Sequence, residues 1–249
     1  MKKKRKTKRK VNKSKNNKVL IMINCVQAVL ILVLALYIWN TKSEIKELEQ
    51  AKEQAVKEEA AKKGENYVFL GDSITDWYPI SKFFSDDTPI INSGFAGDKT
   101  KDLLIDMDET VYRYNPTKVF IQIGTNDLNC DDSNGEQAYN NIVKMIKNIK
   151  KNRPYAEVYV ESIYPVNQTD DERINKSTTG KRTNEDIKEL NSQLEEYCKN
   201  NDVKYIDMYN ELVDENGNLK LEYTVDGLHL STEGYSVVSD VLKTYIKEN

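Results

Sequence analysis

The chain has 249 residues, which is enough for one well-packed domain with appended segments. Its formal net charge of −3 conceals an asymmetry: residues 1–18 contain eleven of the 37 Lys and Arg residues and no acidic residue, which leaves 26 basic against 40 acidic residues elsewhere. A basic head thus precedes an acidic body. One histidine and three cysteines, without metal-ligand or redox spacing, argue against a zinc site and a disulfide scaffold.

Residues 19–39 contain no charged side chain and predict a membrane anchor. A helix of this length would span roughly 30 Å, the hydrocarbon thickness of a bilayer, and Tyr37 and Trp39 stand at its far end as interfacial aromatic residues would. A cleaved signal peptide is the alternative, but the apolar run is longer than a usual signal core and lacks a clear cleavage site. Residues 1–18 then mark the cytoplasmic side, rather than a nucleic-acid site, and residues 40–249 are expected outside.

Residues 40–65 are rich in Glu, Lys, Ala and Gln, with Glu and Lys at helical spacing and few apolar side chains. This composition predicts an exposed helical stalk that ends near Gly64. Residues 66–249 remain for a single folded domain, and 184 residues are enough to bury a substantial core.

Within residues 66–249, short β-rich runs alternate with helix-like stretches. The predicted strands are 66–71, 89–92, 118–123, 157–162 and 203–208. The predicted helices are about 99–114, 135–152, 183–200 and 231–247. This alternation is typical of an α/β fold with a parallel sheet covered on both faces.

Small or polar residues follow three of the predicted strands, where each one gives way to a loop. Ser73 follows the first strand, Asn92-Ser93-Gly94 follows the second, and Gly124-Thr125-Asn126-Asp127 follows the third. In open parallel sheets, binding sites form outside the carboxyl ends of the strands. We therefore expect these three turns to converge on one edge of the sheet.

The single histidine, His229, precedes the final predicted helix and follows Asp226 by three residues. A serine is a poor nucleophile unless a base takes its proton, and imidazole is the base most often used. His229 is the one imidazole in the chain, and its position suits a return to the sheet edge where Ser73 is expected. These residues predict a serine hydrolase.

Four motifs carry a family resemblance: GDS at 71–73, NSGFAG at 92–97, GTND at 124–127 and DGLHL at 226–230. Through these motifs, in this order, residues 66–249 resemble the SGNH or GDSL hydrolases, a family of serine esterases and lipases. The resemblance implies a three-layer α/β/α sandwich with a five-stranded parallel sheet, a flavodoxin-like arrangement. It also implies ester hydrolysis without a metal or other cofactor.

The resemblance further implies a role for each matching residue. Ser73 would be the nucleophile, His229 the base, and Asp226 the acid that orients the imidazole. The backbone N–H groups of Ser73 and Gly94 and the side-chain amide of Asn126 would form the oxyanion hole. Gly94 has no Cβ to shield its N–H, and Asn126 supplies an uncharged donor.

Several other residues have competing interpretations. Asp72 and Asp127 are expected to bond nearby backbone N–H groups rather than to act in catalysis. Four aromatic residues after strand ends either line a substrate pocket or pack in the core: Trp77, Tyr78, Phe95 and Tyr164. Residues 163–183 form a long polar loop with almost no large apolar side chains, which favours a polar substrate.

The remaining acidic pairs and cysteines carry no predicted site. The pairs Asp86-Asp87, Asp131-Asp132 and Asp170-Asp171 indicate solvated loops rather than calcium sites. Cys25 lies in the predicted anchor, and the sequence leaves open whether Cys130 and Cys198 pair.

Together these features predict a membrane-anchored serine esterase that faces the outside of the cell. The expected substrate is a small acyl ester, such as an O-acetyl group on a cell-envelope glycan, and no nucleic-acid partner is expected. The alternatives are an acyltransferase with the same residues, an esterase for short-chain lipid esters, and a non-catalytic glycan-binding module. The acyl chain length, the alcohol part and the oligomeric state stay open.

Overall fold

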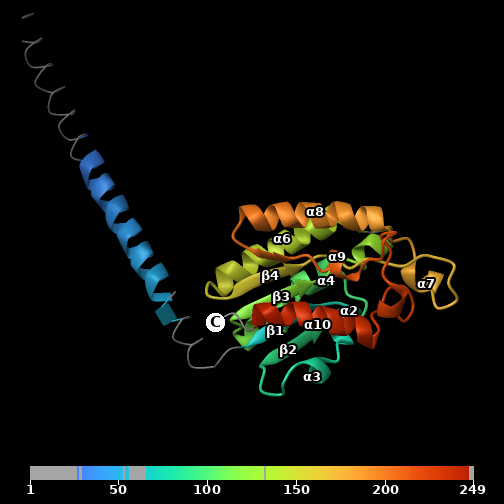
Figure 1. Cartoon of the computed structure of the whole chain (residues 1–249). Helices are drawn as coiled ribbons and strands as arrows, with labels where there is room; N and C mark the ends of the chain where they lie inside the picture. Colours follow the sequence, from blue (N-terminus) through green and yellow to red (C-terminus); the bar gives the residue numbers. More distant parts are fainter. Residues whose placement is uncertain (1–26, 28–29, 53, 56–65, 132, 247–249) are drawn as a thin grey trace, which may run out of the picture. The chain divides into compact units, whose positions relative to one another are not determined.

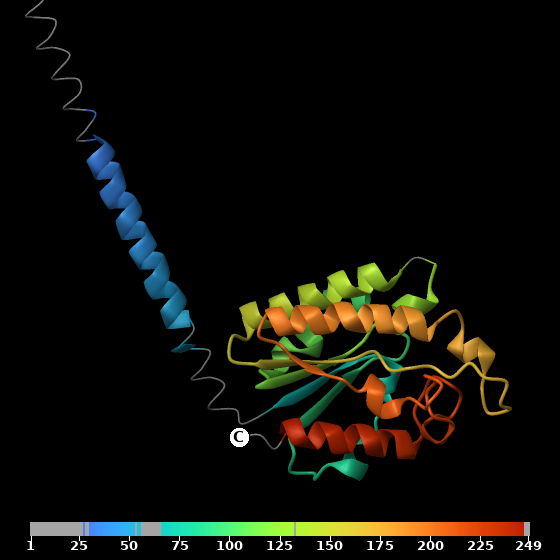
Figure 2. The ribbon, with the colours of Figure 1, turned by 45° about the horizontal axis from the view of Figure 1, so that its top comes forward.

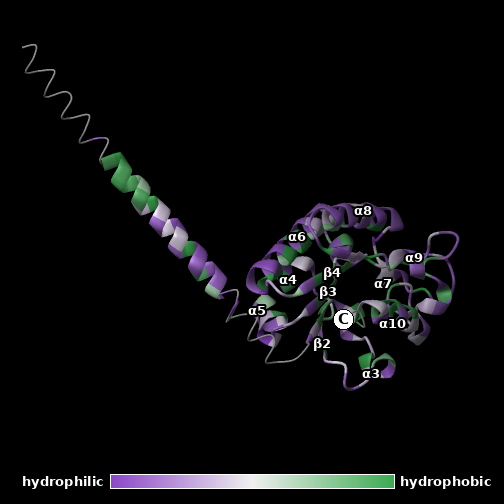
Figure 3. Ribbon diagram, turned by 60° about the vertical axis from the view of Figure 1, so that its left-hand side comes forward, coloured by the Kyte–Doolittle hydropathy of each residue, from purple (hydrophilic) through white to green (hydrophobic). Residues whose placement is uncertain are grey.

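The computed structural model describes residues 27, 30–52, 54–55, 66–131 and 133–246. The chain forms two compact units, Met1–Ala55 and Val56–Asn249. In the first unit, residues 30–52 are helical with mostly exposed side chains. This helix is hydrophobic at its start and more hydrophilic further along (Figure 3).

The predicted anchor and stalk are described only in part. Residues 19–26 and 28–29 of the anchor lie outside the described residues, as do 56–65 of the stalk. The described residues between 40 and 55 are helical. Among the helices that the structure describes, none is both long enough and apolar enough to cross a membrane.

Five parallel strands form the sheet of the second unit, in the order β2-β1-β3-β4-β5. Each strand overlaps a predicted β-rich run, which confirms the five-stranded parallel sheet. In the register, Gly71 lies between Gly94 and Gln122. The strands are β1 (Tyr67–Gly71), β2 (Ile90–Gly94), β3 (Lys118–Gln122), β4 (Glu157–Glu161) and β5 (Lys204–Ile206).

Helices cover both faces of the sheet and complete three layers (Figures 1 and 2). Helices α4, α6 and α8 lie on one face, and α10 lies on the other. The three longest begin and end within one residue of the predicted bounds. The four helices of the two outer layers are α4 (Thr100–Ile105), α6 (Gly135–Asn152), α8 (Asn184–Asn200) and α10 (Thr232–Ile246).

The alternation of side chains along each strand creates two buried cores. Val68 and Leu70 of β1 pack on the side of α6 and α8, whereas Phe69 points to the side of α10. Phe69 meets Phe120 of β3 edge to face, with ring centroids 5.1 Å apart. Burying each large apolar side chain contributes about 1.5–3 kcal/mol, so these two cores hold the strand ends in place.

One predicted helix, 99–114, is interrupted in the structure. It divides into α4, α5 (Met107–Thr110) and the 3₁₀ turn η1 (Tyr112–Tyr114). Asp106 stands where α4 ends, and a carboxylate is unfavourable at the negative end of the helix dipole. The short elements that have too few residues to show periodicity were not predicted: α2 (Ser73–Asp76), α3 (Ile80–Phe83), η2 (Asp127–Asn129), α7 (Lys176–Thr179), α9 (Tyr209–Leu212) and η3 (Leu221–Tyr223).

A buried acid, Glu161, ends β4 on the face covered by α10. It is 4 % exposed, and its Oε2 accepts a hydrogen bond from the hydroxyl of Tyr164. Burial raises the pKa of Glu161 to about 7, although the Tyr164 hydrogen bond acts in the opposite direction. The folded protein therefore binds this proton more tightly than the unfolded chain does.

We expect Glu161→Gln to stabilise the fold at alkaline pH and to matter little at acidic pH. The wild-type contribution is fully present below the ordinary pKa of 4.5 and is lost as the pH rises toward 7, because ionising the buried carboxyl is then favoured only in the unfolded chain. Glutamine still accepts from Tyr164 and cannot ionise. The gain in the free energy of unfolding should be about 2–3 kcal/mol larger at pH 8 than at pH 5 in urea titrations. The exposed Glu196→Gln is the control, and an equal gain at both pH values would contradict the prediction.

Candidate active site

The turn after β1 places Ser73 at the carboxyl end of the sheet. Asp72 caps α2, since its Oδ1 accepts a hydrogen bond from the N–H of Ile74 at 3.0 Å. Gly71 has no room for a side chain, because a Cβ there would lie 2.4 Å from the carbonyl oxygen of Gln122. β1 and β3 therefore lie close together at the point where the chain enters α2. Ser73, the first residue of α2, is only 7 % exposed.

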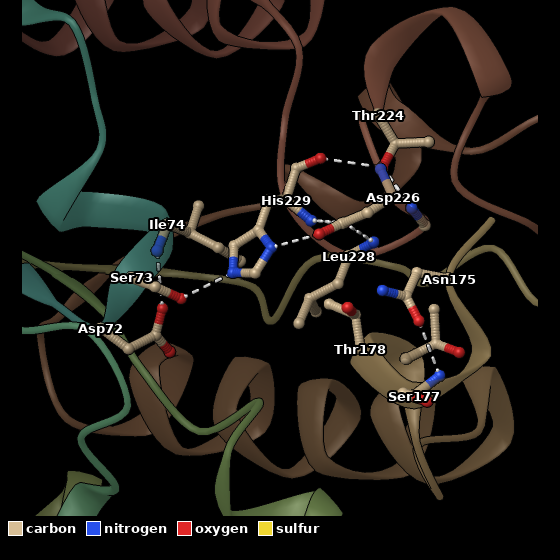
Figure 4. Close-up of polar contacts among 12 residues, drawn as sticks. Asp72, Ser73, Ile74, Asn175, Ser177, Thr178, Thr224, Asp226, Leu228 and His229 are labelled. Carbon is tan, nitrogen blue, oxygen red and sulfur yellow. Dashed lines mark hydrogen bonds and ion pairs between the residues drawn. The ribbon is translucent and has the colours of Figure 1, made fainter. Parts of the chain in front are cut away.

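Ser73, His229 and Asp226 form a continuous chain of hydrogen bonds (Figure 4). Ser73 Oγ lies 3.0 Å from His229 Nε2, and His229 Nδ1 lies 2.7 Å from Asp226 Oδ2. Ser73 and His229 come from opposite ends of the domain and are 156 residues apart in sequence. The imidazole can therefore take a proton from the serine hydroxyl while the carboxylate stabilises the cation that forms.

The loop before α10 fixes the orientation of Asp226. Its Oδ1 accepts hydrogen bonds from the backbone N–H groups of Leu228 at 2.9 Å and His229 at 2.8 Å. Thr224 Oγ1 donates to the carbonyl oxygen of His229 at 2.8 Å and so closes the loop. Burial raises the pKa of Asp226, but the hydrogen bonds from His229 and Leu228 outweigh it and hold this pKa below its ordinary value. Asp226 is therefore ionised at neutral pH.

Of the three N–H donors predicted for the oxyanion hole, one is already hydrogen-bonded to another side chain in this structure. The N–H of Ser73 opens α2, where the first N–H groups of a helix have no acceptor within it. Asn126 Nδ2 donates one of its two hydrogens to the carbonyl oxygen of Asp98 at 2.9 Å. The N–H of Gly94, in contrast, donates to Asn92 Oδ1 at 2.9 Å. Two of the three groups thus have a donor to offer in this structure, and the third is bound to a neighbouring side chain.

Gly94 lies directly against the backbone of α2, and we expect Gly94→Ala to destabilise the fold and the site together. A Cβ at this position would lie 2.1 Å from the backbone nitrogen of Asp76 and 2.6 Å from its Cα. Backbone atoms cannot turn aside as a flexible side chain can, so α2 must shift. The expected cost is about 3 kcal/mol or more in urea unfolding. The matched control is Gly135→Ala, because a Cβ at Gly135 would meet only Leu128, at 3.7 Å. Gly97→Ala does not serve, since Gly97 has a φ of 89° at which an alanine would be strained. A Gly94→Ala protein as stable as Gly135→Ala would contradict this account.

The four aromatic candidates separate into two pairs. Trp77 is 54 % exposed and its ring lies over the imidazole of His229, with ring centroids 4.2 Å apart. Phe95, which follows β2, is 46 % exposed. Tyr78 and Tyr164 are buried in the core under α10, with their hydroxyls bonded to Ser239 and Glu161. Of the two interpretations left open for these tyrosines, their burial supports packing in the core, since their rings complete it and their hydroxyls are hydrogen-bonded within it.

Both acids beside the motifs hold backbone in place. Asp72 bonds the N–H of Ile74 as expected, but Asp72 Oδ2 is buried without a hydrogen-bond partner. Burial raises the pKa of Asp72 to about 7, and the Ile74 hydrogen bond and the charge of Arg182 oppose that shift. Asp127 does not bond its own turn. It accepts from the N–H and the hydroxyl of Thr100 at the start of α4, at 2.9 and 2.7 Å.

The sequence interpretation missed Arg182, which is 2 % exposed and bonded to the Asn126 side chain. Arg182 stands in the polar segment 163–183. The sequence of such a segment does not distinguish a buried arginine bound to backbone carbonyls from a solvated one. Across the part of the chain that the structure describes, no group of His, Cys, Asp or Glu could hold a metal ion. Cys130 and Cys198 are both free thiols.

A model of the GDSL-like lipase/acylhydrolase family matches residues 69–237. The chain belongs to the GDSL-like lipase/acylhydrolase family. The match spans the four motifs and places this part of the chain among the serine ester hydrolases.

Two solved structures resemble this family member over almost their whole length. A protein from Streptococcus pneumonia, named for platelet activating factor, is 32 % identical with a TM-score of 0.68, over 81 % of this chain and 97 % of that one. A GDSL-like lipase from Bacteroides thetaiotaomicron VPI-5482 is 28 % identical with a TM-score of 0.65, over 78 % of this chain and 97 % of that one.

The curated relatives are longer than this GDSL-like chain. The N-acylneuraminate cytidylyltransferase of Escherichia coli O18:K1:H7 is 32 % identical over 180 residues, which cover 72 % of this chain and 39 % of the relative. A protein of the same name from Streptococcus agalactiae serotype V is 26 % identical over 134 residues, 29 % of its own length. The chain therefore spans less than half of the curated relatives that it matches.

Proposed function

We propose that residues 66–249 form a serine esterase that hydrolyses small acyl esters through an acyl-serine intermediate. The observation that carries this proposal is the hydrogen-bond chain from Ser73 Oγ through His229 to Asp226. Ser73 Oγ attacks the ester carbonyl carbon as His229 Nε2 takes its proton. Asp226 holds the proton on Nδ1, so that Nε2 is the free base.

The full reaction in this proposal has two tetrahedral oxyanions. Collapse of the first expels the alcohol, which receives its proton from His229 and leaves the acyl group on Ser73. Water then attacks with His229 as base, and collapse of the second oxyanion releases the acid and restores the serine. Ser73 N–H and Asn126 Nδ2 stabilise both oxyanions, and Gly94 joins them when the substrate oxygen replaces Asn92 Oδ1 as its acceptor.

The proposed substrate is an O-acetyl or similarly small acyl ester on a carbohydrate, such as a cell-envelope glycan. Trp77 and Phe95 are exposed near the triad and offer flat surfaces on which a sugar ring can stack. The segment 163–183 beside the site is polar. The name of the Escherichia coli relative refers to an acylated sugar acid, which supports a carbohydrate substrate.

We also propose that residues 19–39 anchor the chain in the cell membrane with its N-terminus in the cytoplasm and residues 66–249 outside. The basic residues 1–18 and the uncharged run that follows them support this orientation. In intact cells, added protease should cut within residues 40–65 of the full-length chain and release the esterase. A domain that resists cleavage until the cells are lysed would contradict the orientation.

The test of the esterase uses the full-length chain with a fluorophosphonate probe and with esters. Ser73 should be the labelled residue, and acetate should be released from p-nitrophenyl acetate and from acetylated glycan polymers. Faster hydrolysis of short-chain lipid esters than of the polymers would favour a lipid esterase, the reading that the name of the Streptococcus pneumonia structure suggests. Transfer of acetyl to an added sugar in preference to water would indicate an acyltransferase. A Ser73 that never labels would leave only the glycan-binding module.

A further inference from the structure

The side-chain amide of Asn126 is held from both ends by groups of different segments. Arg182 Nη2 donates to Asn126 Oδ1 at 2.9 Å, and Asn126 Nδ2 donates to the carbonyl oxygen of Asp98 at 2.9 Å. A guanidinium has donors and no acceptor, so the end of the amide that faces Arg182 has to be the oxygen. Nδ2 consequently points to the turn that follows Gly94, the last residue of β2, and that contains Asp98.

Arg182 is itself fixed by a full set of hydrogen bonds. Nε donates to Thr125, at 2.8 Å from the carbonyl oxygen and 2.9 Å from Oγ1, and Nη1 donates at 3.0 Å to the carbonyl oxygens of Thr178 and Thr179. None of these acceptors is a carboxylate. Burial lowers the pKa of Arg182 while the nearby charge of Asp72 raises it, and a guanidinium stays protonated throughout the physiological range.

The backbone around Arg182 is pinned to the loop that contains Asn126. The N–H of Lys181 donates to Asn129 Oδ1 at 2.8 Å. Gly180, with a φ of 60°, comes so close that a Cβ would lie 2.0 Å from the same oxygen. Thr183 then caps α8, its Oγ1 accepting from the N–H of Asp186. These contacts fix the turn between α7 and α8, and that turn fixes the position of the Arg182 guanidinium.

We infer that Arg182 is a positioning residue for the reaction, which fixes the Asn126 amide with its remaining N–H toward the oxyanion and polarises it into a stronger donor. The inference rests on the proposed function, in which Asn126 stabilises the oxyanion. It has added weight because the N–H of Gly94 is bound to Asn92, so Asn126 carries a larger share of the stabilisation. A buried positive charge on the amide oxygen draws electron density from Nδ2 and strengthens its hydrogen bond to a developing anion.

The test compares single and double variants of the full-length chain. Asn126→Ala should lower kcat about 10²–10³-fold, as loss of one oxyanion donor does. Arg182→Met should lower kcat roughly tenfold to a hundredfold with KM within about twofold, because a donor displaced by an ångström loses that much. In the Asn126→Ala background, Arg182→Met should cost less than about twofold more, since its effect acts through the missing amide. Arg173→Met is the matched control, an exposed arginine of the same segment bonded to Asp171.

A purely structural arginine gives a different pattern. It would lower the unfolding temperature without changing kcat of the folded protein, or its loss would multiply with that of Asn126→Ala, and either result overturns the inference. If Arg182→Met does not fold, Arg182→Lys keeps the buried charge and a donor for Thr178 and Thr179 but lacks the planar fork, and the same cycle applies with the same expected outcome. These failures leave the wild-type turnover intact. A wild type that neither hydrolyses esters nor labels at Ser73 removes the proposed function and the inference together.

Discussion

Replacing Ser73 with alanine is expected to reduce kcat for p-nitrophenyl acetate by roughly a thousandfold or more, with the fold intact. In the proposed reaction the hydroxyl is the group that bonds to the carbonyl carbon, and its hydrogen-bond partner in the structure is His229 Nε2. The deletion leaves no acyl-enzyme, so water must attack directly. Because that hydroxyl holds no other element in place, circular dichroism and the unfolding midpoint should be those of the wild type.

The control for this substitution is Ser81→Ala, an exposed serine in α3 that takes no part in the hydrogen-bond chain from Ser73 to Asp226. It should retain full activity and full labelling by fluorophosphonate. Mass spectrometry of the wild type after a brief exposure to substrate should find the acyl group on Ser73. Equal turnover by wild type and Ser73→Ala on every ester would mean that the turn after β1 serves only the architecture.

The second large effect is expected at Asp226, where Asn should lower kcat by about 10⁴-fold. The new side chain can still accept from the N–H groups of Leu228 and His229 through its oxygen. Its NH₂ group then faces His229 Nδ1, which must become an acceptor. The imidazole proton moves to Nε2, and the base can no longer take a proton from Ser73. The variant should fold and bind substrate with little change in KM.

The pH dependence adds a second test of Asp226. Hydrogen bonds to its carboxylate outweigh burial and hold the pKa of Asp226 below its ordinary value of 3.8, so its charge persists across the working range of an imidazole base. Rates measured from pH 5 to 9 should therefore remain low throughout for Asp226→Asn. Asp240→Asn, an exposed aspartate on α10 paired with Lys243, should match the wild type. Recovery of the Asp226→Asn rate at any pH in this range would argue against the orienting role.

The sequence predicted the sheet and the approach of Ser73 to His229 because both depend on strong local signals. The centres of β1 and β3, VFL at 68–70 and VFI at 119–121, are apolar without interruption, as expected for strands buried on both faces. The motifs follow strand ends, and a parallel sheet brings all of those ends to one edge. Ser73, Asn126 and His229 could therefore be grouped without coordinates.

The features that were missed depend on contacts between distant segments. From the sequence alone Arg182 resembles a solvated residue. Its burial follows from the packing of the turn before α8 against the loop after β3. For Tyr78 and Tyr164, which follow strand ends, the sequence left a substrate pocket and core packing both open, and only the packing of α10 favours the core. The hydrogen bond from Gly94 to Asn92 depends on backbone torsions that residue types alone do not determine.

The separation of Ser73 from His229 by 156 residues has a consequence for how the enzyme is made. The serine leaves the ribosome early, in the turn after the first strand, whereas its base is among the last parts of the domain to be synthesised. Until α10 has packed under the sheet, the hydroxyl has no proton acceptor and reacts no faster than any other serine. If Ser73 and His229 act as proposed, hydrolytic activity arises only with the finished fold. A nascent or truncated chain is then expected to be inert toward esters, and recovery of turnover during refolding should report the closure of the contact between these two residues.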